Sequence, residues 1–172
     1  LIFFFFTISL FAQENWNQQI DAKLPQVISS HRTFVSIPNL PSDIQKMYRN
    51  VAWVKEHYSK VGFELKTLES STLPVLFAER IINPAFKTIL FYFHLDGQAV
   101  NSKSWNQKDP FQPVLKEQNE AGQWDEIAWS RADEKMKDDW RIFGRAAADD
   151  KAPIVMFLSA LELLQSSKQT PK

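Results

Sequence analysis

Cysteine is missing from all 172 residues of the sequence. Its absence excludes disulfide bonds and thiolate chemistry, so any metal ion must be bound by histidines and carboxylates. Histidine is scarce too, and the three in the chain are His31, His57 and His94. His31 has no acidic neighbour on its predicted helix, and His57 lies on a charged, solvated helix face. We therefore expect neither of these two to bind a metal.

An excess charge of either sign is also missing. Lys and Arg together number 20, Asp and Glu together number 20, and the formal net charge is +0. The chain therefore lacks the excess of positive charge that is typical of proteins that bind nucleic acid or another polyanion, and we expect no nucleic-acid partner. The length suits a single domain with a sizeable core.

Long apolar runs are limited to one, LIFFFFTISLFA at residues 1–12. The run is too short to span a bilayer comfortably but matches the hydrophobic part of a secretory signal peptide. Ala12 suits a cleavage point before Gln13, although Leu10 suits it poorly. A buried N-terminal strand is the alternative, which the polar residues from Gln13 disfavour. We interpret residues 1–12 as a truncated signal peptide and expect an exported protein, periplasmic or extracellular, with no membrane span in its mature form.

Two helices are predicted in the next part of the chain. The first is expected to begin at Pro25, which fits a first helical turn. Ser42 is a suitable N-cap for the second, which has apolar residues at helical spacing. Gly62 is expected to end that second helix.

Three strands are predicted next, at 63–68, 74–79 and 88–93. The third, TILFYF, is the most apolar and is typical of a strand buried on both faces of a parallel sheet. This order predicts an α/β fold, an α/β/α sandwich with a mixed, largely parallel sheet. His94 and Asp96 follow the third strand directly, and ligands of open α/β sheets bind beyond the carboxyl ends of strands. Side chains two residues apart on a strand point to the same side, so this pair can share a site.

A second motif follows a polar, irregular connection predicted at 98–140. We expect the tryptophans of the connection to pack it onto the domain, with a substrate cleft as the alternative. Asp149 and Asp150 then stand before a helix whose first turn suits Pro153. An aspartate there can cap the helix or bind a metal, and composition alone leaves both roles open.

Together the motifs resemble a known family. HLDGQAV begins at His94, a Trp-Pro-Phe-Pro segment lies within 105–113, and GRAAADDK begins at Gly144. This order resembles the zinc metallopeptidase family of aminoacylase, carnosine dipeptidase, carboxypeptidase G, acetylornithine deacetylase and succinyl-diaminopimelate desuccinylase. FVSIP at 34–38 also resembles the start of that family's catalytic domain. The similarity covers about residues 16–164, matches the dipeptidase-like branch best, and corresponds to the first part of a typical member.

The resemblance implies roles for three residues. His94 would be a terminal ligand of one zinc ion, and Asp149 would bridge two zinc ions. Asp96 would be the catalytic carboxylate that aligns the imidazole. The resemblance also implies a cis peptide bond between Asp149 and Asp150. The substrate would be a small peptide or an N-acyl amino acid, and the full-length protein would be a homodimer.

The chain also departs from the family pattern. The family usually has Gly-Arg-Gly where this chain has Gly-Arg-Ala, and Ala146 fits only if its φ is not positive. The family's general-base glutamate, its other metal ligands and its dimerisation domain lie beyond the bridging aspartate. We therefore predict that residues 16–172 are the N-terminal part of a zinc peptidase catalytic domain, incomplete and inactive alone. The alternative is a non-catalytic α/β module that keeps the motifs as fold remnants.

Overall fold

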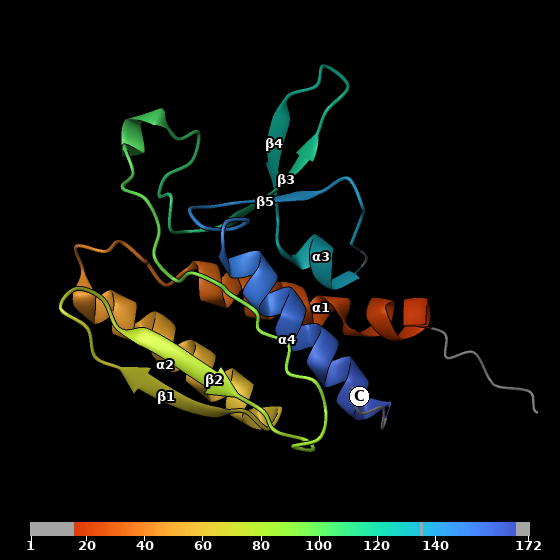
Figure 1. Cartoon of the computed structure of the whole chain (residues 1–172). Coiled ribbons are helices and arrows are strands. Elements are labelled where there is room, and N and C mark those ends of the chain that lie inside the picture. Colours follow the sequence, from red (N-terminus) through yellow and green to blue (C-terminus); the bar gives the residue numbers. More distant parts are fainter. Residues whose placement is uncertain (1–15, 135, 168–172) are drawn as a thin grey trace, which may run out of the picture.

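The computed structural model describes residues 16–134 and 136–167, so the predicted signal peptide at 1–12 lies outside the described residues. Two long helices come first in the chain, and the described strands that follow form two small sheets (Figure 1). None of the described helices is long and apolar enough to cross a membrane. The helices are α1 (Trp16–Val35), α2 (Ile44–Lys60), the 3-10 helix η1 (Ser102–Ser104), α3 (Ser130–Glu134) and α4 (Lys151–Ser166). The strands are β1 (Glu64–Leu68), β2 (Val75–Glu79), β3 (Val114–Gln118), β4 (Trp124–Ile127) and β5 (Arg141–Phe143).

Two small antiparallel sheets replace the predicted parallel one. β1 pairs with β2, and β3 lies between β4 and β5. Parallel neighbours need a long crossover connection, whereas residues 69–74 and 119–123 join their strands by short turns. The α/β character is confirmed, and β1 and β2 lie where two strands were expected. The mixed, largely parallel sheet of a sandwich is wrong for the described residues, in which every strand pairing is antiparallel.

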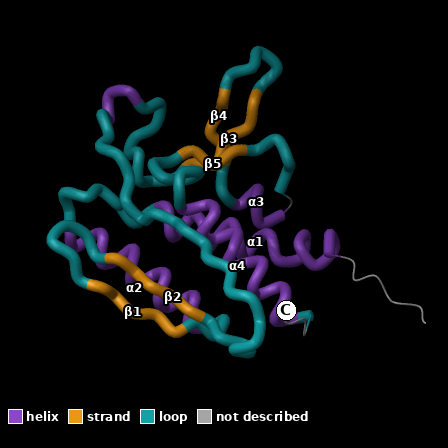
Figure 2. The backbone as a smooth tube through the Cα atoms, viewed as in Figure 1, coloured by secondary structure: helices purple, strands orange, loops and turns teal. Residues whose placement is uncertain are grey.

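The apolar segment 88–93 is extended but is not a strand in a sheet. It belongs to the long loop that Figure 2 shows between β2 and β3. Leu90 is 88% exposed and Tyr92 is 84% exposed, contrary to the predicted burial on both faces. Phe91 does contact Phe157 of α4, with ring centroids 4.4 Å apart. The apolar composition of segment 88–93 favours burial. A buried strand also needs neighbouring strands, however, and no described strand pairs with this segment.

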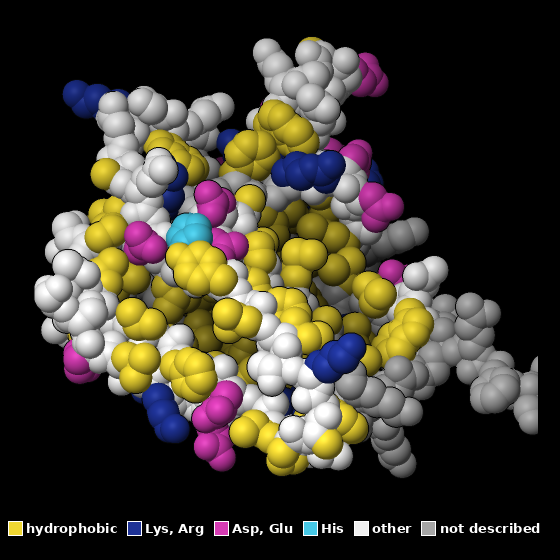
Figure 3. All heavy atoms as spheres, viewed as in Figure 1, with side chains coloured by type: hydrophobic (Ala, Val, Ile, Leu, Met, Phe, Trp, Pro, Cys, Tyr) yellow, Lys and Arg dark blue, Asp and Glu magenta, His cyan; other side chains and the backbone are white. Residues whose placement is uncertain are grey.

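The exposed segment lies on a broadly apolar face. Hydrophobic side chains cover much of the face that Figure 3 shows, and the same face carries a histidine among acidic side chains. Several large apolar residues on β1, β2 and the following loop are exposed as well, among them Leu68, Val75, Phe77, Ile81 and Ile82.

The main core lies between α1, α2 and α4. The ring of Phe34 on α1 stacks on Trp53 of α2, with centroids 4.0 Å apart. The buried hydroxyl of Tyr58 donates a 2.8 Å hydrogen bond to the carbonyl of Ile154 on α4. These contacts fix the end of α1 and the start of α4, the two helix ends that lie beneath the candidate site.

The helix boundaries differ from the prediction at both N-termini. Pro25 lies inside α1, which begins nine residues earlier at Trp16. Asp43 rather than Ser42 is the N-cap of α2, because its carboxylate accepts a hydrogen bond from the Lys46 backbone N–H. The second helix ends before Gly62 as expected, and the φ of this glycine is +85°.

A second, smaller core lies under the β3–β4–β5 sheet within the connection predicted to be irregular. Its buried members are Leu115, Ala132 and Trp140. The carboxylate of Glu117 on β3 accepts hydrogen bonds from the indole N–H of Trp140 and from the side chains of Arg131 and Lys137. Trp140 therefore packs within the connection itself, whereas we expected the tryptophans to pack the connection onto the domain. The connection is more regular than its polar composition predicts.

Candidate metal centre

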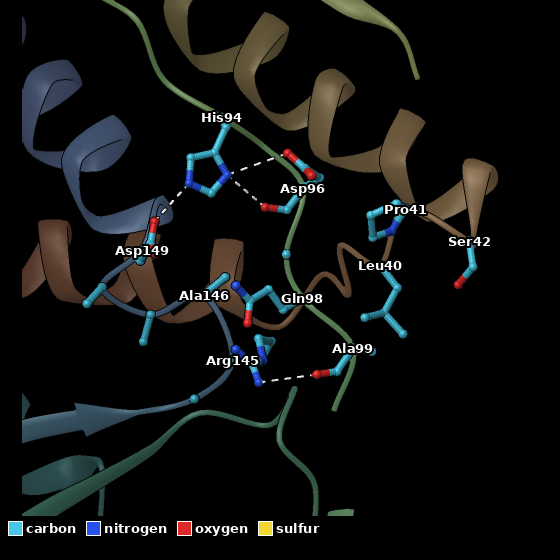
Figure 4. Close-up of a pocket in the computed structure, with 14 residues that line it drawn as sticks. Leu40, Pro41, Ser42, His94, Asp96, Gln98, Ala99, Arg145, Ala146 and Asp149 are labelled. Carbon is cyan, nitrogen blue, oxygen red and sulfur yellow. Dashed lines mark hydrogen bonds and ion pairs between the residues drawn. The ribbon is translucent and has the colours of Figure 1, made fainter. Parts of the chain in front are cut away.

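His94 and Asp149 meet in space although 55 residues separate them in the sequence. His94 follows the extended segment 88–93, and Asp149 lies in the turn between β5 and α4. Nε2 of His94 lies 2.8 Å from Oδ1 of Asp149, as the dashed line in Figure 4 shows. The structure thus places side by side the two residues that were predicted as zinc ligands.

Asp96 contacts the other nitrogen of the His94 ring. Its backbone carbonyl lies 2.9 Å from Nδ1, and its carboxylate oxygen lies 3.5 Å from the same nitrogen. A carbonyl only accepts hydrogen bonds, so Nδ1 carries a proton and Nε2 faces Asp149. The closer contact that orients the ring therefore comes from the backbone of Asp96, whereas its carboxylate was expected to align the imidazole.

The surroundings of His94 are negatively charged. Burial acts to lower the pKa of His94, but the hydrogen bonds to Asp149 and to the Asp96 carbonyl, with the charges of Asp150 and Asp149, raise it above its ordinary value. Surroundings that stabilise the imidazolium cation also favour a metal cation. The Asp149 carboxylate is 87% exposed, so it can take up further contacts on the pocket side.

Asp150 contacts the backbone of His94. Its Oδ2 atom accepts a 3.0 Å hydrogen bond from the His94 backbone N–H. Asp150 is the N-cap residue of α4, yet its side chain makes no capping hydrogen bond. The cis peptide bond that the resemblance implies between Asp149 and Asp150 is present. Capping by the Asp150 side chain, one of the two roles left open for this pair, is therefore wrong.

Asn39 supports the other side of the His94–Gly97 segment. It is 1% exposed, its Nδ2 donates a 2.8 Å hydrogen bond to the Leu95 carbonyl, and its own carbonyl accepts one from the Gly97 N–H at 2.8 Å. A Cβ atom at Gly97 would lie 2.7 Å from Oδ1 of Asn39, which only a glycine avoids. Both peptide groups that flank Asp96 are thus fixed by one buried side chain and its backbone.

Lys151 and His31 fix the turn that carries the aspartates onto the end of α1. Lys151 is 1% exposed, and its Nζ donates hydrogen bonds to the carbonyls of Phe34 and Ile37. Burial lowers the pKa of Lys151 to about 7. The Nε2 atom of His31 lies 2.7 Å from the Ala147 carbonyl, and burial lowers the pKa of this histidine. His31 is therefore a buried, hydrogen-bonded helical residue.

The backbone of this turn includes one strained residue. Ala146 has a φ of +63°, in the left-handed region that favours glycine. This conformation contradicts the condition that an alanine would fit only without positive φ. The buried turn tolerates it, because the Lys151 N–H donates to the Ala146 carbonyl and the neighbouring Arg145 N–H donates to the Pro110 carbonyl.

A pocket of about 800 Å³ opens beside His94 and Asp149. The loop after α1, the His94–Ala99 segment and the turn at 144–149 line it (Figure 4). A pocket of this size is typical of sites for small ligands. Polar groups from three distant stretches of the chain therefore converge on one concave surface.

Comparisons with known proteins find metallodipeptidases that are similar in sequence to most of this chain. The Cys-Gly metallodipeptidase dug1 of Schizosaccharomyces pombe is 24% identical over 156 residues, which are 83% of this chain and 28% of that protein. The Cys-Gly metallodipeptidase DUG1 of Saccharomyces cerevisiae is 24% identical over 168 residues, 88% of this chain and 31% of that protein. No family model matches the chain.

Two solved structures share the fold. The dipeptidase Dug1p of Saccharomyces cerevisiae superposes with a TM-score of 0.64 at 23% identity, and human carnosine dipeptidase 1 with a TM-score of 0.67 at 20% identity. Each match covers 89% of this chain and 31% of the other. The chain is a low-identity relative of metallodipeptidases. The predicted resemblance is confirmed, and the chain spans about a third of the length of these metallodipeptidases.

The donor atoms at the site fit zinc in part. Imidazole nitrogen and carboxylate oxygen are both common zinc donors, and a catalytic zinc takes three protein ligands. Among residues 16–134 and 136–167, no group of three or more His, Asp or Glu is placed to hold a metal ion. His94 and Asp149 could therefore supply two ligands of a zinc site, which would need at least one more.

The sequence predicted the candidate ligands that the fold brings together, but it did not predict the residues that hold them in place. The metallodipeptidase-like motif directed attention to His94, Asp96 and Asp149. Asn39 gave no signal except its position after the FVSIP segment, which itself resembled the family. Lys151 was noted as part of a motif, but nothing in the sequence showed that it reaches back to the end of α1.

Proposed function

We propose that this chain is the N-terminal part of an exported dinuclear zinc hydrolase that cleaves the amide bond of a dipeptide, another small peptide or an N-acyl amino acid. The observation that carries the proposal is the 2.8 Å approach of His94 Nε2 to Asp149 Oδ1 at the edge of the pocket. Relatives named as metallodipeptidases support both the reaction class and a metal cofactor. The zinc ions, when bound, would polarise the scissile carbonyl and activate a water molecule.

The chain's own residues would have separate tasks in this reaction. His94 and Asp149 would hold the zinc ions, and Asp149 would be the ligand that the two ions share. Asp96 would hold the His94 ring in one orientation and one tautomer through its contacts with Nδ1. The pocket would receive the peptide beside these groups. The general base and the remaining ligands would come from a later part of the polypeptide, so the chain alone would be inactive.

A non-catalytic α/β module remains the second candidate. The observation that favours it is the absence of a third ligand among the described residues. The two proposals differ in what the gene encodes after Lys172. Sequencing the gene further would decide: a following glutamate pair and a distal histidine support the hydrolase, and their absence supports the module.

Activity of the full-length protein tests the hydrolase directly. We expect zinc-dependent hydrolysis of dipeptides, abolished by His94→Ala and by Asp149→Ala. His57→Ala is the matched control, because the His57 ring stacks on Trp53 and contacts the Trp53 carbonyl, away from the pocket. Near-normal turnover in either site variant would refute the assignment.

A further inference from the structure

The peptide group between Asp96 and Gly97 connects the ring of His94 to Asn39. It is a trans peptide, so its N–H and its carbonyl point to opposite sides of one rigid plane. The Gly97 N–H donates a 2.8 Å hydrogen bond to the Asn39 carbonyl. On the other side, the Asp96 carbonyl lies 2.9 Å from Nδ1 of the His94 ring. A rotation of this plane that breaks the contact with Asn39 therefore also moves the acceptor away from the ring.

The Asn39 side chain holds the neighbouring peptide group as well. Its Nδ2 donates a 2.8 Å hydrogen bond to the carbonyl of Leu95, which belongs to the peptide group before Asp96. Its Oδ1 has no hydrogen-bond partner among the described residues, although Asn39 is 1% exposed. A buried carbonyl oxygen without a partner is costly, so packing alone does not explain an asparagine here. The hydrogen bonds that offset this cost run to the segment that carries Asp96.

Asn39 is itself fixed from α2. Nδ2 of Asn50 donates hydrogen bonds to the carbonyl of Pro38, directly before Asn39, and to the carbonyl of Lys46, at 2.9 and 2.8 Å. Asn50 is fully buried, so water does not compete for these hydrogen bonds. A hydrogen-bonded path thus runs from α2 to the ring whose other nitrogen faces Asp149 (Figure 4).

We propose that Asn39 is a positioning residue that sets the tautomer of His94. By holding the plane of the Asp96–Gly97 peptide, it presents the Asp96 carbonyl to Nδ1. The ring then carries its proton on Nδ1 and keeps the lone pair of Nε2 for a metal ion, since a neutral imidazole binds metals through its unprotonated nitrogen. The tautomer is a property of the metal-free protein, and only its consequence for zinc binding rests on the proposed function.

The test is nitrogen-15 NMR of the metal-free, full-length protein labelled on its histidines, at a pH at which the ring is neutral. Asp149→Ala is the reference, because it removes the carboxylate that competes for a proton on Nε2. The signals of His94 are those that His94→Ala removes. We expect the reference to hold the proton mainly on Nδ1, and adding Asn39→Ala should lower that fraction at least twofold. Adding Leu115→Ala, which disrupts the smaller core instead, should leave the fraction unchanged.

Gly97→Ala perturbs the same contact without removing Asn39. A Cβ atom at Gly97 would lie 2.7 Å from Oδ1 of Asn39, so this variant should also lower the fraction protonated on Nδ1. It decides the test if circular dichroism shows that Asn39→Ala does not fold. A fraction that neither substitution changes, an equal change in Leu115→Ala, or a proton mainly on Nε2 in the reference would each overturn the proposal.

Zinc titrations with Asp149 intact separate this proposal from the proposed function. If both hold, Asn39→Ala weakens zinc binding by about tenfold, as is typical of residues that orient metal ligands. If the tautomer depends on Asn39 but the wild type binds no zinc, the hydrolase proposal fails and the positioning role stands. Zinc binding that is equally tight in the wild type and in Asn39→Ala would overturn the role of Asn39 in the centre.

Discussion

Asp150 accepts a hydrogen bond from the backbone N–H of His94 across 3.0 Å, while its neighbour Asp149 contacts the ring of the same histidine. Two consecutive carboxylates thus contact one residue from two sides. The first fixes the backbone of His94, and the second faces its Nε2 atom. The candidate centre depends on this double contact, because segment 88–93 has no sheet partner in the described structure to fix it.

Asp150→Ala is expected to weaken metal binding without removing a ligand. Loss of the hydrogen bond frees the His94 backbone, and supporting residues of this kind typically change metal affinity by about 10- to 100-fold. Zinc titration of the variant measures the effect. Asp139→Ala, an exposed aspartate before β5, is the control. Unchanged zinc affinity in Asp150→Ala would contradict a positioning role.

Asn39 and Gly97 form a coupled pair. Asn39→Ala removes a hydrogen bond and leaves the Leu95 carbonyl unsatisfied, at a cost of about 2 kcal/mol. Gly97→Ala places a methyl group 2.7 Å from Oδ1 of Asn39, at a similar cost of about 2 kcal/mol. Because Asn39→Ala also removes the atom that clashes, the double variant should lose less than the sum by about 1 kcal/mol or more. Urea unfolding measures all three; strict additivity would show that the contact is absent.

The strained backbone at Ala146 predicts a stabilising substitution. Left-handed backbone costs a residue with a side chain about 1–2 kcal/mol, and glycine avoids that cost but loses more chain entropy on folding. Ala146→Gly should therefore raise the free energy of unfolding by about 0.5 kcal/mol. Ala147→Gly, next to it and without a positive φ, should lower that free energy by about 1 kcal/mol. Equal effects of both substitutions in chemical denaturation would contradict the assigned backbone geometry.

Glu117 gives the small sheet an acid-sensitive contact. Hydrogen bonds from Lys137, Trp140 and Arg131 lower the pKa of Glu117 to about 2, from the ordinary value of 4.5. A carboxylate with a lowered pKa in the folded state stabilises it above pH 4.5, and this contribution is lost as the pH falls towards 2. The difference in Tm between wild type and Glu117→Gln should therefore shrink from pH 7 to pH 2. Glu120→Gln, on the exposed β3–β4 turn, should show little difference at any pH; a constant Glu117→Gln difference would rule out the assigned ionic contact.

The features that were predicted correctly from the sequence depend on short-range patterns of residues. Helix spacing, the Gly62 stop and the strands at 64–68 and 75–79 need only local information. The motifs directed attention to His94 and Asp149, which the fold brings together. Apolar composition at 88–93 indicated burial but could not show which strands, if any, pair with it.

The residues that hold the candidate centre in place contact residues that are far away in the sequence. Lys151 reaches Phe34 over 117 residues, and Asn39 reaches Leu95 over 56. A lysine at the start of a helix and an asparagine after a proline are usually exposed, so the types of these two residues did not predict their burial. The role of Asp150 could not be predicted from the sequence either, since an aspartate before a helix usually caps that helix.

Zinc binding by His94 and Asp149 is the central claim, and a titration in competition with a chromophoric chelator tests it most directly. The chain should bind zinc weakly, since the described residues provide two ligands. Zinc affinity should fall at least tenfold in His94→Ala and in Asp149→Ala, and it should be unchanged in His57→Ala. Zinc affinity equal to wild type in both site variants would contradict a metal centre at this pocket.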